Sequence, residues 1–239
     1  MAQPLLTFSL IHSPFLGPSS WWSVGEALDR NGMRALTLDL SDALEAGGRV
    51  YESLGEIAAR QITARSILVA HSGAGALVPT ICRYASGRIL GVIFVDALLP
   101  HQGRSWFDTA PAALAERIRR DARLGRAPPW PSWLPESVLA DLLPDRDMRE
   151  SLINSAPQVP LGFLGELAPE CSAPTTQYGC AYLQLSEAYR VEAEQSRASG
   201  WAVEQFNGHH LSALTDPAGV AQGIIDLALG LARRAPPAA

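Results

Sequence analysis

The sequence predicts an α/β fold with a mostly parallel sheet of about six strands and helices on both faces. Six short apolar runs alternate along the chain with longer segments of helical periodicity, as in folds whose parallel strands are joined by helical connections. Two of these runs, residues 66–70 and 91–95, are apolar at nearly every position. Such runs are expected of central strands that helices cover on both faces.

The expected elements follow each other in a regular order. The predicted strands cover residues 5–11, 34–40, 66–70, 91–95, 181–185 and 202–206. Apolar residues at helical spacing predict helices over residues 19–32, 50–62, 75–86, 186–199 and 217–231. The last of these helices opens at Pro217, and proline is favoured at the first position of a helix.

One long segment interrupts this alternation. Between residues 101 and 174 we find no strand pattern, only helical pieces separated by proline-rich stretches such as APPWPSWLP. We therefore expect a core made of residues 1–100 and 175–239, with residues 101–174 inserted as a helical cap or lid. Two roles are open for the tryptophans of this segment, lining an apolar substrate pocket or packing the cap onto the core: Trp106, Trp130 and Trp133.

Composition and charge exclude several classes of protein. The 239 residues are 47% hydrophobic and carry a formal net charge of -5, which gives no general attraction to nucleic acid or to anionic lipid. No stretch approaches the roughly 20 apolar residues that span a bilayer. The short apolar run at the N-terminus has no basic residue before it, unlike a secretory signal. We expect a cytoplasmic protein that binds neither nucleic acid nor membrane.

The three cysteines, Cys82, Cys171 and Cys180, do not indicate a disulfide framework or a zinc site, since their number is odd and no CxxC spacing occurs. A phosphate-binding glycine-rich loop is not expected either, because Gly73 and Gly75 are not followed by G-K-[ST]. No metal or organic cofactor is therefore predicted.

Ser72 stands in a turn between an apolar run and a predicted helix. Residues 70–74 read Ala-His-Ser-Gly-Ala, a relaxed form of the pattern G-x-S-x-G. In that pattern the serine occupies a strained strand-to-helix turn, and the residues two before and two after are small because strand and helix nearly touch there. Two interpretations are open: Ser72 is a reactive nucleophile, or it caps the helix that follows.

A second motif, VEQFNGHHLSALTDPAGVA at residues 203–221, follows the last predicted strand. Together with the Ser72 turn, it resembles the α/β-hydrolase superfamily, whose catalytic histidine lies in a loop of the form G-H-φ-x-x-φ-x-x-P. His210 matches this register better than His209, because Leu211, Leu214 and Pro217 follow it at the expected positions. The alternatives are His209 in that role, or two solvated loop histidines.

The resemblance also implies an oxyanion hole made by two backbone amides. Many members of the superfamily have His-Gly-x after the first strand, where this chain has His12-Ser13-Pro14. Pro14 has no N–H and cannot donate a hydrogen bond. We therefore expect the donors to be Phe15, placed by its position in the loop, and Gly73, placed at the start of the helix after Ser72.

Two carboxylates are candidates for the acid that orients the histidine. Asp96 ends the wholly apolar run 91–95, and some members of the superfamily place the acid there. Glu187 follows the run 181–185, where most relatives keep it, but the chain turns directly into a helix at that point. We favour Asp96, with Glu187 as the alternative; a further possibility is that Asp96 only caps the turn into the insertion.

Taken together, Ser72, His210 and Asp96 predict a serine hydrolase that cleaves an ester or thioester of a small, largely apolar substrate. The superfamily also contains lyases and cyclases that use a Ser-His pair as acid and base, and catalytically inactive ligand-binding proteins, and both classes stay open as alternatives. The Arg-, Ala- and Pro-rich composition resembles that of high-GC actinobacteria, where such enzymes often act in secondary metabolism.

Overall fold

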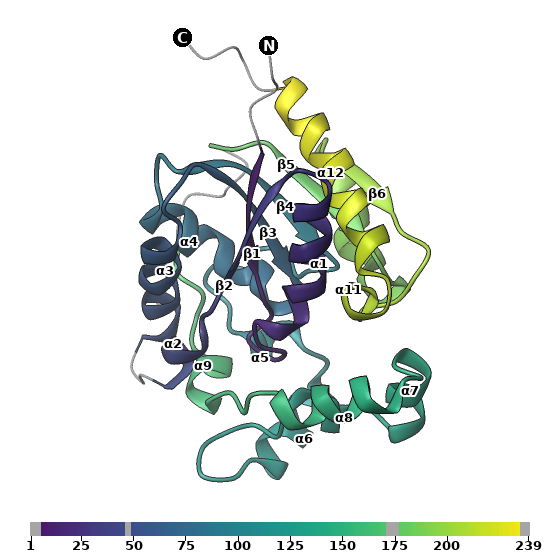
Figure 1. Ribbon diagram of the computed structural model, residues 1–239. Helices are drawn as coiled ribbons and strands as arrows, with labels where there is room; N and C mark the ends of the chain where they lie inside the picture. Colours follow the sequence, from purple (N-terminus) through teal and green to yellow (C-terminus); the bar gives the residue numbers. More distant parts are fainter. Residues whose placement is uncertain (1–5, 46–48, 171–176, 235–239) are drawn as a thin grey trace.

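The structure is a computed structural model that describes residues 6–45, 49–170 and 177–234 (Figure 1). Its centre is a six-stranded sheet in the order β2-β1-β3-β4-β5-β6, with every neighbouring pair parallel. The predicted α/β class, the strand number and all six strand positions are confirmed. The strands are β1 (Thr7–Ile11), β2 (Arg34–Leu38), β3 (Ser66–His71), β4 (Ile89–Val95), β5 (Cys180–Gln184) and β6 (Ala202–Gln205).

Helices cover both faces of the sheet (Figure 1). One face is packed by α1 (Ser19–Arg30), the short α11 (Ser212–Thr215) and α12 (Pro217–Arg234). The other face is packed by α2 (Ser41–Glu45), α3 (Val50–Gln61), α4 (Val78–Tyr84) and α10 (Arg190–Ala198). Parallel strands are joined by such crossover helices. Because the helices cover both faces of the sheet, the central strands are apolar on both sides.

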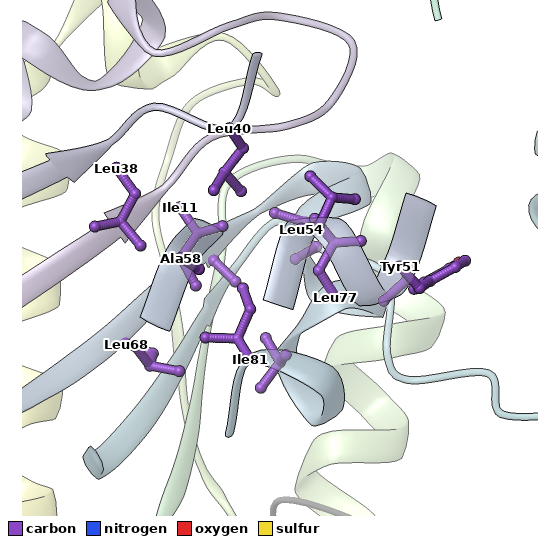
Figure 2. Close-up of a cluster of buried hydrophobic side chains, with 14 of the residues drawn as sticks. Ile11, Leu38, Leu40, Tyr51, Leu54, Ala58, Leu68, Leu77 and Ile81 are labelled. Carbon is purple, nitrogen blue, oxygen red and sulfur yellow. The ribbon is translucent and has the colours of Figure 1, made fainter. Parts of the chain in front are cut away.

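Alternate strand residues belong to two separate cores. In β3, Leu68 and Ala70 face the α3 and α4 side, whereas Ile67 and Val69 face α1 and α12. Figure 2 shows part of the first core, where side chains of β1 and β3 meet those of α3 and α4. Each fully buried leucine or isoleucine contributes about 1.5–3 kcal/mol through removal of apolar surface from water. These two cores hold the carboxyl ends of the strands in fixed positions.

The segment between β4 and β5 is helical in its described part, residues 101–170. Figure 1 shows its helices α6, α7 and α8 beyond the end of the sheet near α5. We call its described part, residues 101–170, the helical insertion; that residues 101–174 act as a cap and divide the core as expected stays a prediction. Its helices are α5 (Trp106–Thr109), α6 (Ala112–Asp121), the 3₁₀ helix η2 (Trp130–Trp133), α7 (Glu136–Leu142), α8 (Arg146–Ser155) and α9 (Leu161–Gly165).

The insertion is attached to the core by polar and aromatic contacts. The carboxylate of Glu166 accepts hydrogen bonds from the first amides of α3, those of Val50 at 2.8 Å and Tyr51 at 3.4 Å. These amides have no partner within the helix, so a carboxylate there both satisfies and electrostatically stabilises the helix start. The ring of Phe163 in α9 packs on Tyr51, with ring centroids 5.4 Å apart.

Within the described residues, no helix has both the length and the apolar character needed to cross a membrane.

The thiols of Cys82 and Cys180 are buried, and burial raises the pKa of Cys180 to about 12. Cys171 lies outside the described residues.

Candidate active site

The predicted site residues gather where the strands end at their carboxyl side. The chain leaves β1 toward β2 on one side, whereas β3 lies on the other side of β1, so the sheet has a switch point between β1 and β3. In open parallel sheets, ligands bind in the crevice at such a point. Ser72 directly follows β3, Asp96 directly follows β4, and His210 lies in the loop after β6.

Ser72 begins a 3₁₀ helix, η1 (Ser72–Leu77), and has a φ of 56°. A non-glycine residue rarely adopts this left-handed conformation, which costs on the order of 1–3 kcal/mol. The turn is closed by a hydrogen bond from the amide of Leu98 to the carbonyl of Ser72, at 3.0 Å. At Gly75, an added Cβ would lie 1.8 Å from the carbonyl oxygen of Leu98, so only glycine fits.

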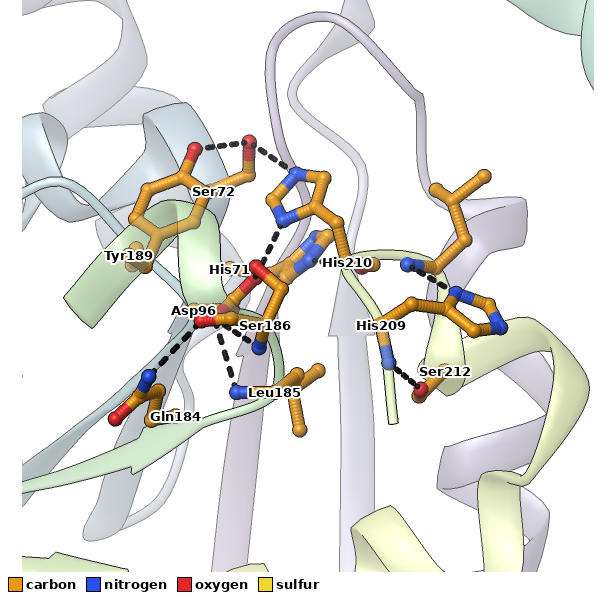
Figure 3. Close-up of polar contacts among 12 residues, drawn as sticks. His71, Ser72, Asp96, Gln184, Leu185, Ser186, Tyr189, His209, His210 and Ser212 are labelled. Atoms are coloured by element: carbon orange, nitrogen blue, oxygen red, sulfur yellow. Dashed lines mark hydrogen bonds and ion pairs between the residues drawn. The ribbon is translucent and has the colours of Figure 1, made fainter. Parts of the chain in front are cut away.

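The hydroxyl of Ser72 points at His210 rather than capping a helix. The distance from Ser72 Oγ to His210 Nε2 is 3.1 Å, and His210 Nδ1 lies 2.7 Å from Asp96 Oδ2 (Figure 3). Asp96 is fully buried, and His210 is largely buried. A carboxylate on Nδ1 favours the tautomer with its proton on that nitrogen, which leaves Nε2 free to accept the serine proton.

Asp96 is held by a complete set of donors. Its Oδ1 accepts from the amides of Leu185 and Ser186, each at 2.9 Å, and its Oδ2 accepts from Ser186 Oγ at 2.6 Å (Figure 3). Burial by itself raises the pKa of Asp96, but the hydrogen bonds and charge of His210 and the bonds from Ser186 and Leu185 outweigh it, so the pKa is lowered. Asp96 is therefore a carboxylate at neutral pH.

The two alternative residues lie elsewhere. The ring of His209 accepts a hydrogen bond from the amide of Leu211 at 3.2 Å and contacts the hydroxyl of Thr215. The side chain of Glu187 is 77% exposed and pairs with Arg190. The structure thus brings Ser72, His210 and Asp96 together and leaves these two out. The catalytic role of each residue stays a prediction.

The loop after β1 is fixed from both sides. His12 Nδ1 donates to the carbonyl of Ser13 at 2.9 Å, and its Nε2 accepts from the amide of Leu40 at 3.1 Å. The ring of Phe15 packs on Gly73, where an added Cβ would approach Phe15 Cε2 to 2.9 Å. The N–H of Phe15 donates to Ser13 Oγ at 3.3 Å. This bond counts against Phe15 as a free oxyanion donor, whereas Gly73 retains the expected position at the start of η1.

The tryptophans of the insertion take different positions. Trp133 is buried, donates from Nε1 to the carbonyl of Pro128 at 2.8 Å, and packs edge-on against Phe15. Trp106 also contacts Phe15, with ring centroids 5.6 Å apart. Trp130 is half-buried, and its ring lies 6.0 Å from that of His210. Packing thus accounts for Trp133, whereas Trp130 borders the site.

Comparison with known proteins identifies the architecture. No family model matches the sequence, and no curated protein matches it. Solved structures match along nearly the whole chain. An extracellular α/β-hydrolase from a Paenibacillus species, described as a structural and functional homologue of tobacco salicylic acid binding protein 2, is 21% identical with a TM-score of 0.75; the match covers 93% of this chain and 98% of that one.

Two further structures give the same result. Polyneuridine aldehyde esterase is 17% identical with a TM-score of 0.72, covering 94% of this chain and 99% of that one. A variant of tomato methylketone synthase I is 12% identical with a TM-score of 0.71, covering 96% and 100%. The chain has the α/β-hydrolase fold. The resemblance seen in the motifs around Ser72 and His210 is confirmed at the level of the fold.

The carboxylate that contacts His210, that of Asp96, follows β4 and not β5. Ser186 lies after β5 instead, and it donates both its amide and its hydroxyl to Asp96. Sequence reasoning missed Ser186, His71 and Tyr189. His71 Nε2 donates to the carbonyl of His210 at 3.1 Å, and its ring stacks on His210. The only sequence signal for these residues was their position next to strand ends.

No metal centre accompanies these residues in the described ranges, where no group of three or more histidine, cysteine, aspartate or glutamate side chains is placed to hold a metal ion.

The buried His71 makes stability depend on pH. Burial, and then the charge of His210, lowers the pKa of His71 to about 3, whereas an unfolded histidine has a pKa near 6.5. Between these values the unfolded chain binds a proton that the folded chain does not, so the free energy of unfolding rises with pH. We expect His71 to contribute up to about 1.4 kcal/mol per pH unit across this window.

Denaturant unfolding of the wild type and of His71→Phe, measured from pH 3 to pH 7, checks this expectation. The variant loses the bond to His210 and is less stable at neutral pH, but its stability should depend less steeply on pH. Equal slopes for the two proteins would show that His71 is not the titrating group.

Proposed function

We propose that the protein is a serine hydrolase that cleaves an ester or thioester through an acyl-enzyme. The observation that carries the proposal is the hydrogen-bonded chain from Asp96 through His210 to Ser72. Ser72 is the nucleophile, His210 the general base and acid, and Asp96 the carboxylate that orients and stabilises the imidazole. The strained turn fixes Ser72 at the end of β3, the position that the nucleophile has in a G-x-S-x-G turn.

In the first step, His210 Nε2 takes the proton of Ser72 while Oγ bonds to the substrate carbonyl carbon. The electron pair of the C=O bond moves to oxygen, and the Gly73 amide donates to that oxyanion. When the tetrahedral intermediate collapses, His210 returns the proton to the leaving alcohol or thiol. A positioned general base is worth about 10²–10⁴ in rate, and one oxyanion donor about 10²–10³.

Water then releases the acid. His210 takes a proton from a water molecule whose oxygen attacks the acyl carbon, and the second intermediate expels Ser72 Oγ, which regains its proton from His210. Asp96 stays ionised through both steps because its four hydrogen bonds hold the charged form. No external reactant besides water is required.

The surroundings support a small and largely apolar substrate. Phe15 and Trp106 pack together beside Gly73, and Trp130 borders His210. Such aromatic surfaces favour apolar acyl or alkyl groups. Neighbours of the same fold carry matching descriptions: one is named an esterase and another a pyrethroid hydrolase, at 17% and 18% identity. A role in secondary metabolism and a cytoplasmic location are parts of this proposal that rest on the sequence.

A second candidate is a lyase or cyclase that uses Ser72 and His210 as acid and base without an acyl-enzyme. It is favoured by the loop after β1, where Pro14 lacks an N–H and the Phe15 amide is bonded to Ser13. A methylketone synthase among the neighbours also has this fold.

Labelling with a fluorophosphonate tests the nucleophile without knowledge of the substrate. We expect a single adduct on Ser72 by intact-mass spectrometry and peptide mapping, and none in Ser72→Ala. A labelled protein that turns over no ester would favour the lyase or cyclase. Absence of an adduct on the folded wild type would overturn the hydrolase proposal and favour a binding protein.

Matched substitutions test the acid and the base. Asp96→Asn should lower kcat by on the order of 10⁴-fold, because the imidazole loses its orienting carboxylate and takes the wrong tautomer. Glu187→Gln is the control for the acid, and its kcat should stay within about threefold. His210→Ala should be inactive, whereas His209→Ala should retain activity.

Steady-state kinetics on an aryl ester measures all four variants. A larger loss of kcat in Glu187→Gln than in Asp96→Asn would make Glu187 the acid. Inactivity of His209→Ala alone would make His209 the base.

A further inference from the structure

Among the described residues, the Ser72 hydroxyl forms hydrogen bonds with two side chains, those of His210 and Tyr189. Tyr189 ends the 3₁₀ turn η4 (Glu187–Tyr189), which follows β5 after Leu185 and Ser186. Its hydroxyl lies 3.4 Å from Ser72 Oγ, and its ring stacks on the His210 ring with centroids 4.9 Å apart and planes 10° apart (Figure 3). Tyr189 therefore reaches a reacting atom of the proposed site.

In the loop after β1, residues 14–17 have no free backbone amide. Pro14 has no N–H, and the amide of Phe15 donates to Ser13 Oγ. The next two amides, those of Leu16 and Gly17, donate to the carbonyl of Ser13 at 3.1 and 3.3 Å. The side of the oxyanion hole that this loop supplies in many α/β-hydrolases thus offers no free backbone donor in residues 14–17.

Counting protons fixes the direction of the Tyr189 bond. His210 has its proton on Nδ1 toward Asp96, so its Nε2 accepts the only proton of the Ser72 hydroxyl. Ser72 Oγ can then only accept from Tyr189. The phenol proton is aimed at Oγ before the reaction starts. The carbonyl oxygen of a bound ester lies one bond beyond the carbon that Oγ attacks, within reach of the same proton.

We propose that the Tyr189 hydroxyl donates the second hydrogen bond to the oxyanion, in place of a backbone amide of the loop after β1. The inference rests on the proposed acyl transfer. As the bond from Ser72 Oγ to carbon forms and the serine proton moves to His210, the carbonyl electron pair moves to oxygen. Tyr189 turns its O–H from Oγ to that oxygen and keeps its proton throughout.

The environment of Tyr189 suits a donor. Burial raises the pKa of this phenol, and the hydrogen bond with Ser72 opposes that rise only in part. The hydroxyl is therefore protonated across the working range of pH. The nearby carboxylates of Asp96 and Glu192 raise the pKa of the phenol further. Arg190, the neighbour of Tyr189, pairs with Glu187 and Glu194 on the outer surface.

Tyr189→Phe removes the hydroxyl and keeps the ring that stacks on His210. Tyr84→Phe is the matched control, because Tyr84 also loses a hydroxyl hydrogen bond, at 2.6 Å to Glu52, but lies at the far end of α4 from Ser72. The substrates are p-nitrophenyl acetate, whose leaving group needs no proton, and ethyl acetate, whose leaving group does. The rate of fluorophosphonate labelling of Ser72 is measured on the same proteins.

For Tyr189→Phe we expect kcat/KM to fall by about 10²–10³ on both acetates, with slower labelling and an unchanged acid limb of the pH profile. Tyr84→Phe should match the wild type. A loss on ethyl acetate alone would overturn the inference and make Tyr189 a proton donor to the leaving group. A shifted acid limb would make it a positioning residue for His210.

Unchanged labelling and turnover in Tyr189→Phe would also overturn the inference while leaving the serine hydrolase intact. Failure of the wild type itself to label at Ser72 would instead overturn the proposed function. The two failures are therefore distinguishable.

Discussion

The hydrogen bond between His210 and Asp96 is the contact on which the arrangement of the site depends. It joins the loop after β6 to the end of β4, across the intervening strand β5. A buried carboxylate without partners would cost several kcal/mol, and here donors from Leu185 and Ser186 at the end of β5 offset that cost. Three strand ends are thereby held in one hydrogen-bonded network, and the imidazole is left facing Ser72.

Two of the three non-glycine residues with positive φ among the described residues lie at the same place. Ser72 and Asp96 both have positive φ values, 56° and 44°. They follow adjacent strands, and each is held by a neighbour: the Ser72 carbonyl accepts from Leu98, and the Asp96 amide donates to the carbonyl of Leu183 at 2.8 Å. Tyr182 adds two bonds to the amide and carbonyl of Ala97. The buried sheet stabilises conformations that these residues would not adopt alone, so the groups that we propose to react are already positioned in the structure without a substrate.

Local sequence patterns were enough to predict most of the fold and part of the candidate site. Apolar runs locate the six strands, and the motifs at Ser72 and His210 are visible because spacing along the chain encodes them. The sequence favoured Asp96 and kept Glu187 as the alternative, because the pairing of β4 with β5, which places Ser186 beside Asp96, is not visible in local spacing. The positions of Tyr189 and His71 in the site could not be predicted from sequence, because their partners lie more than 100 residues away along the chain. The hydrogen bond from the Phe15 amide to Ser13 likewise depends on a turn that the local sequence pattern does not reveal.

The most direct test of this account is nitrogen and proton NMR of the His210 ring in the resting protein near neutral pH. We predict that Nδ1 carries the proton and that this proton resonates strongly downfield because it is bonded to the Asp96 carboxylate. The signal should be lost in Asp96→Asn and kept in Glu187→Gln. A proton on Nε2, or a downfield signal that persists in Asp96→Asn, would contradict the assignment of Asp96 and with it the proposed proton transfer from Ser72 to His210.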